Sequence, residues 1–156
     1  MNFRIALILH LVSMAVLAGG GLGGMLLHRP LVAAVRGGTP QLAGLADAVR
    51  RLGLMARLGA VLLLASGLYL AWAMHWADFQ MRWFHIKLGV YVGMWVLSLG
   101  LAAPAAAKFG AALTRRAQGE DTTRVLEESL ATMGFYNVLI LAGFIAIVML
   151  VIVGAR

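Results

Sequence analysis

Residues 129–155 read SLATMGFYNVLILAGFIAIVMLVIVGA and contain no Asp, Glu, Lys or Arg. About 20 consecutive apolar residues are enough for a helix to cross the hydrocarbon core of a bilayer. Three further stretches of at least that length lack the same four residue types, at 5–28, 58–77 and 88–107. The runs are continuous rather than alternating, which favours helices over a membrane barrel. The sequence therefore predicts an all-α fold, an integral membrane four-helix bundle.

The predicted helices form a single transmembrane domain that covers 1–156. We expect them at about residues 4–28, 56–77, 83–106 and 130–154. The first run extends far beyond the roughly 7–15 apolar residues of a secretory signal peptide, so we expect it to remain as a helix.

The two longer connections, 29–55 and 107–129, are predicted to be cytoplasmic loops with some helix of their own. Thr39-Pro40 is typical of a helix start, and the helix that follows either lies on the membrane or continues into the second span, with Gly53 as a possible break. Asp121-Thr122-Thr123 predicts a cap before the fourth span, and Gln118-Gly119 predicts the end of the third helix. The segment 34–41 is the best candidate for a flexible linker.

The net charge of +7 is unevenly distributed along the chain. One group of basic residues lies in or beside the two long loops: Arg29, Arg36, Arg50, Arg51, Arg57, Lys108, Arg115, Arg116 and Arg124. A smaller group lies at the opposite ends of the helices: Arg4, Arg82, Lys87 and Arg156. Because loops rich in Lys and Arg stay in the cytoplasm, both termini are expected on the outer, periplasmic side of a bacterial inner membrane. The basic excess then sets topology and meets anionic lipid rather than nucleic acid.

Several chemistries are excluded by the residues that the chain lacks. There is no cysteine, which rules out thiolate ligands, disulfides and iron–sulfur clusters on this chain. No catalytic triad, phosphate-binding loop, HExxH motif or carboxylate pair is present either. Hydrolysis and phosphoryl transfer are therefore not expected.

The strongest candidates for a functional site are His10, His85 and Lys87. Ionisable groups at membrane depth are costly and usually functional. Helices one and three run in the same direction, so His10 and His85 fall in the outer half of the bundle. Two imidazoles on facing helices can ligate a haem iron, and neutral imidazole also suits copper. Lys87 either reaches the outer interface or pairs with an anionic group of a ligand.

Glycines strengthen the idea of a pocket beside these histidines. Gly19–Gly24 is rich in glycine, and Gly89 and Gly93 follow His85 at steps of four. Such residues allow either a flat macrocycle or a neighbouring helix to come close. His28 and Arg57 lie at the cytoplasmic side; Arg57 is expected to bind lipid phosphate or a ligand carboxylate.

A copper site is the alternative interpretation of the same region. Met14, Met74, His75 and Met81 lie near the outer histidines, and thioether with imidazole is a plausible soft ligand set for Cu(I). Methionine is also an ordinary residue of membrane helices. Trp76, Phe79, Trp83 and Phe84 bracket the short outer connection, as an interfacial aromatic belt does.

Trp83 and the segment Phe84-His85-Ile86-Lys87-Leu88 resemble the Trp-x-His-x-Lys motif of the HemJ-type protoporphyrinogen oxidases. The His10-Leu11 segment, the glycine-rich stretch and His28 resemble the first helix of that family. Leu27-His28-Arg29-Pro30 and the general layout also resemble the CopD copper-resistance membrane domain. The HemJ resemblance implies haem b held by His10 and His85, with Lys87 beside it, and oxidation of a porphyrinogen.

Three functions follow as expectations. The first is a membrane redox protein that binds haem b and exchanges electrons with quinone or another membrane redox protein. The second is a copper-binding or copper-transport protein of CopD type. The third is a structural or assembly subunit of a larger membrane complex, or a homo-oligomer, in which the histidines only pack.

Overall fold

The structure is a computed structural model that describes residues 2–75 and 82–154. In these residues the chain is built from helices, without strands. The helices are α1 (Phe3–Gly37), α2 (Leu42–Ala73), α3 (Arg82–Leu97), α4 (Ala103–Ala117) and α5 (Thr123–Gly154). A π-helical turn at Ser98–Ala102 joins α3 to α4, so that Arg82–Ala117 is one continuous helical rod.

Four helical segments of the described chain are long and apolar enough to cross a membrane: α1, α2, the α3–α4 rod and α5. The prediction of an all-α chain with four such helices is confirmed. Length and composition of this kind indicate a multi-pass membrane protein.

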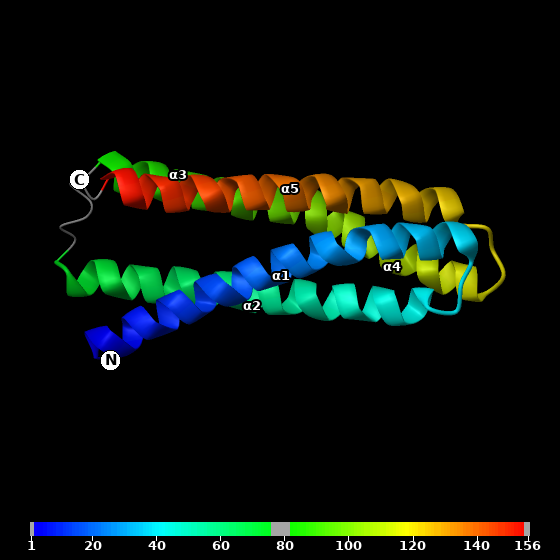
Figure 1. Ribbon diagram of the computed structural model, residues 1–156, viewed down its shortest axis with the longest axis horizontal. Coiled ribbons are helices and arrows are strands. Elements are labelled where there is room, and N and C mark those ends of the chain that lie inside the picture. Colours follow the sequence, from blue (N-terminus) through cyan, green and yellow to red (C-terminus); the bar gives the residue numbers. More distant parts are fainter. Residues whose placement is uncertain (1, 76–81, 155–156) are drawn as a thin grey trace.

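The helices are arranged as two pairs that lie along each other (Figure 1). α1 packs along α2, and α5 packs against α1 as well as against α3 and α4. Within the described residues, the backbones of α2 and of the α3–α4 rod do not come into contact. The start of α1 and the end of α5 lie at one end of the molecule, and the turns at 38–41 and 118–122 lie at the other (Figure 1). We call the end with these two turns the turn end.

The helices extend further than the apolar runs predicted. The expected end of the first helix at residue 28 is wrong, because α1 continues through Pro30 to Gly37. Proline removes one helical hydrogen bond and normally ends or kinks a helix. Here Leu31, Ala34 and Val35 follow at steps of three and one, and all three are buried. Their burial offsets the lost hydrogen bond.

The predicted loops at 29–55 and 107–129 are accordingly wrong in extent. α2 begins at Leu42 and runs through Gly53 without a break, and the predicted linker 34–41 shrinks to a tight turn. Gly38 closes α1 at φ 60°, a left-handed conformation that suits glycine. The end of the third helix at Gln118-Gly119 is confirmed, as is the start of the fourth span beside Asp121, whose carboxylate accepts a hydrogen bond from the Thr123 N–H.

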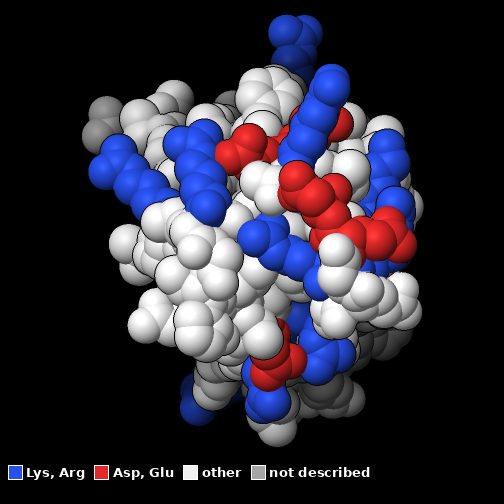
Figure 2. Space-filling view, turned by 90° about the vertical axis from the view of Figure 1, so that its right-hand side faces the viewer, with Lys and Arg blue, Asp and Glu red and all other residues white. Residues whose placement is uncertain are grey.

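The hydrophobic core lies at the turn end, where α1, α2, α4 and α5 meet. It is made of Leu31, Ala34, Val35, Leu42, Phe109, Ala112, Leu126 and Leu130. Arg116 ties α4 to its neighbours by donating to the Val35 carbonyl and to Thr123 Oγ1. Charged side chains of both signs gather on the surface of this end (Figure 2).

Candidate functional site

His10 is half-buried on α1 and faces α2. Its Nδ1 lies 3.0 Å from the hydroxyl oxygen of Ser66, a fully buried residue of α2. The next residue, Gly67, leaves room for the ring, because a Cβ there would lie 3.1 Å from His10 Cε1. The serine and glycine together form a seat for one imidazole.

Ser66 has a hydrogen bond within its own helix as well as the contact with His10, because its hydroxyl donates to the Leu62 carbonyl at 2.7 Å. The backbone of Leu63 is a second hydrogen-bond partner of the His10 ring. With its own proton engaged, the Ser66 oxygen can accept a hydrogen bond from His10 in the tautomer that carries the proton on Nδ1. Metal-binding histidines have this arrangement, in which the second nitrogen donates to a protein oxygen.

His85 and Lys87 lie in the first turns of α3, which Phe84 anchors. Phe84 is buried, whereas His85 is exposed, with its ring edge-on to Phe84 at 6.4 Å between centroids. Lys87 Nζ lies 5.2 Å from the ring centroid of Trp83 and 5.0 Å from that of Phe84. Contacts of this kind between an ammonium and aromatic faces are attractive and hold the lysine close to its own helix.

The two halves of the predicted site, His10 on α1 and His85 with Lys87 on α3, lie on helices whose described backbones do not touch each other. Among the described residues, no backbone contact joins α1 to α3, since α5 lies against both. The Lys87 ammonium is nevertheless close enough to act electrostatically on His10. His10 and Lys87 thus belong to one region, and shared ligation by His10 and His85 stays a prediction.

The residues of the predicted copper set are spread along two helices. Met14 is half-buried one turn after His10, while Met74 and His75 are exposed in the turn that ends α2. His75 has φ 52°, the left-handed region. Met81 lies outside the described residues, as do Trp76 and Phe79. In the chain as described, no three side chains of the His, Asp and Glu types gather to hold a metal ion.

His28 and the glycines have separate roles. His28 packs against Gly134 of α5, where an added Cβ would lie 2.8 Å from the ring, so it fills a helix contact. Gly20 likewise meets Ala56 of α2. Gly89 and Gly93 have open space beside them, which means that they do not mediate packing within the described chain.

A groove that the sequence did not predict lies between α2 and the α3–α4 rod, with α1 and α5 as its floor. Its volume is about 980 Å³, and none of His10, His85 and Lys87 lines it. The lining is mainly apolar and includes small residues of α1, α2 and α4, among them Gly21, Gly24, Ala60, Ala106 and Gly110. Tyr91 closes one end by donating a 2.5 Å hydrogen bond from α3 to the Ala60 carbonyl of α2.

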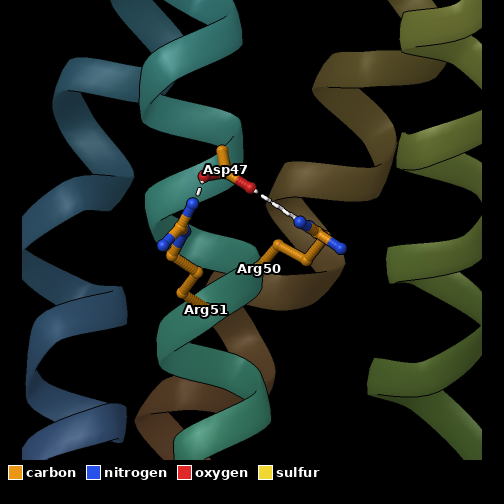
Figure 3. A network of polar contacts seen from close by, with 3 residues as sticks. All are labelled: Asp47, Arg50 and Arg51. Atoms are coloured by element: carbon orange, nitrogen blue, oxygen red, sulfur yellow. Dashed lines mark hydrogen bonds and ion pairs between the residues drawn. The ribbon is translucent and has the colours of Figure 1, made fainter.

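Polar groups of the groove gather along α2 and α3. Trp95 Nε1 is buried beside the Tyr91 hydroxyl without the geometry of a hydrogen bond to it. Asp47 accepts from Arg50 at 2.8 Å and from Arg51 at 2.7 Å (Figure 3). Arg57 also lines the groove and has no hydrogen bond or ion pair with any described residue. In the sequence, this groove could have been predicted from the repeat of small and basic residues along α2.

The described chain therefore offers two candidate sites. One is the histidine seat, made of His10 with Ser66 and Gly67, and the other is the groove toward the turn end. Comparison of the chain with known protein families, with curated proteins and with solved structures finds no match.

Proposed function

We propose that this protein is a multi-pass membrane redox protein that binds haem b through His10, His85 or both. The observation that carries the proposal is the hydrogen-bonded seat of His10 on Ser66. The Ser66 oxygen can accept a hydrogen bond from His10 Nδ1–H, which is how a protein oxygen orients a metal-ligating imidazole. Haem bound there would supply one-electron transfer.

The residues around His10 fit this group. Ser66 orients the imidazole, and a hydrogen bond from Nδ1–H to its oxygen would raise the basicity of Nε2 as a ligand. Lys87 adds a positive charge in the same region, which suits the carboxylates of a porphyrin. His85, exposed at the start of α3, is the second candidate ligand.

The orientation belongs to the same proposal. The turn end carries most of the Lys and Arg residues, as cytoplasmic ends do. Both termini and the histidine seat then lie on the periplasmic side of a bacterial inner membrane. Electrons would pass to or from quinone or another membrane redox protein, and the resemblance to HemJ-type enzymes favours a porphyrinogen as substrate.

The copper-binding and the structural alternatives have less support than the haem proposal. Imidazole Nε2 suits copper as well as iron, but Met74, one of the two described methionines of the predicted copper set, is exposed in the turn that ends α2.

The absorption spectrum of the purified protein, recorded before and after dithionite, tests the proposal. Haem b gives a Soret band that shifts on reduction. A colourless protein that binds Cu(I) stoichiometrically would replace the proposal by the copper alternative. A colourless protein that binds neither and co-purifies with other proteins would leave the structural one.

A further inference from the structure

We propose that the groove between α2 and the α3–α4 rod binds an anionic phospholipid, whose phosphate is held by Arg57. This site is separate from the histidine seat and does not depend on haem. It assigns a ligand to the groove and a role to a charge that has no partner among the described residues.

The groove is shaped and placed for a lipid. Its lining on α2 runs from Leu42 to Ala60, which corresponds to about 27 Å at 1.5 Å per residue. Because α2 does not contact α3 or α4 through its described backbone, the groove opens sideways to the surrounding bilayer. Its apolar lining and its volume of about 980 Å³ suit an elongated apolar ligand rather than a small polar one.

One face of α2 has a composition that helix packing does not explain. Ala46, Arg50, Gly53, Arg57 and Ala60 recur at steps of three and four, so they form one stripe, and all five line the groove. A stripe that packs on another helix is apolar or small throughout. This one alternates small residues with arginines, which leaves space and positive charge on the same face.

The charges of the groove do not cancel. Asp47 is the only acidic residue of its lining, and it is engaged by Arg50 and Arg51. Arg116 is held by the Val35 carbonyl and Thr123. Arg57 is left without a partner among the described residues, ten positions from Asp47 along α2.

The position of Arg57 suits a contact with a lipid phosphate. It is exposed on α2 and directly precedes the apolar run 58–77, so it lies at the border of the lipid-facing part of that helix. Arginines at such borders reach toward the interface, where lipid phosphates lie. A phosphate neutralises the guanidinium through bidentate hydrogen bonds, and acyl chains cover the apolar lining.

The test compares lipid retention in nanodiscs of equal phosphatidylglycerol and phosphatidylcholine, followed by native mass spectrometry. The wild-type protein should retain one phosphatidylglycerol in preference to phosphatidylcholine. Arg57→Gln should reduce that preference roughly tenfold, since a charge-assisted hydrogen bond is lost. Arg29→Gln is the matched control, because Arg29 is exposed on α1 outside the groove, and it should behave as wild type.

A second pair of variants tests the groove without removing a charge. Gly21→Leu places a side chain in open space inside the groove and should abolish retention. Gly19→Leu makes the same change in open space outside the groove and should leave retention intact. Equal retention of both lipids by the wild type would overturn the proposal, as would equal losses within either pair of variants. A dimer that retains no lipid would assign the groove to a second copy.

Discussion

Single glycines decide how closely α1 and α2 approach. A Cβ on Gly20 would lie 2.7 Å from Ala56 Cβ and 3.0 Å from the Leu52 carbonyl oxygen, closer than atoms tolerate. Gly19, the adjacent residue, has open space. Two adjacent glycines in the same glycine-rich stretch thus differ: one has space for a side chain and the other does not.

Gly20→Leu should therefore destabilise the protein by about 1–3 kcal/mol or more, because α1 and α2 must separate. Gly19→Leu should leave stability unchanged or raise it, since leucine favours helix more than glycine does. Thermal unfolding in detergent, followed by circular dichroism, measures both. Equal melting temperatures for the two variants would contradict the described contact of the helices.

Ser66 is the residue that orients His10. Ser66→Ala should weaken haem binding about 10–100-fold, the usual effect of removing a group that orients a metal ligand. Ser13→Ala is the matched control, because Ser13 is equally buried but bonds only to the Leu9 carbonyl of its own helix. Titration of the apoprotein with haem gives both affinities, and equal losses would show that Ser66 has no specific role.

At the scale of the elements, sequence patterns located the helices but not their ends. Apolar runs define what can lie in lipid, whereas α1 and α2 continue beyond the runs into the turn end. There they are held by packing of residues that are far apart in sequence, such as Leu31 with Phe109 and Leu126. The helix continues through Pro30 because of that packing, which cannot be inferred from the residues next to Pro30 in the sequence.

The candidate site was predictable to a similar degree. His10 could be singled out from the sequence because it is ionisable within an apolar run. Its partner Ser66 could not, because the two residues are 56 positions apart and serine is common in membrane helices. Arg57 was expected at the start of the second span and lies instead in the middle of α2, because α2 starts at Leu42.

The start of α5 should respond to acid. The hydrogen bonds from Thr123 hold the pKa of the Asp121 carboxyl below its usual range, and Arg116 adds to this. A carboxyl with a lowered pKa stabilises the fold above its unfolded value of about 3.9, and this contribution is lost as the pH falls through the folded value. Asp121→Ala should lower the melting temperature at pH 7 and have a smaller effect near pH 3. A difference from wild type that is the same at both pH values would contradict this role.

At the scale of the whole molecule, burial follows the solvent. The best-packed residues lie at the turn end among charged side chains, while few residues of each apolar span are buried within the described chain. The hydrophobic effect drives burial only in water, and lipid covers apolar side chains without it. The distribution of burial agrees with a bundle that is surrounded by lipid along its length.

The proposed topology can be tested by cysteine labelling, because the chain has no cysteine of its own. Asn2→Cys lies beside the start of α1, and Gln118→Cys lies at the turn end. In intact cells, a membrane-impermeant maleimide should label Asn2→Cys at once and Gln118→Cys only after lysis. The reverse pattern would place the turn end outside.

The most direct test of the redox proposal is the ratio of haem to protein in two histidine variants. His10→Ala removes the imidazole that Ser66 orients, and His28→Ala removes one that packs on α5 at the opposite half of α1. The ratio is predicted to fall severalfold in purified His10→Ala and to stay at the wild-type level in His28→Ala. A ratio that is unchanged in His10→Ala, or that falls equally in both variants, would contradict haem ligation at the histidine seat.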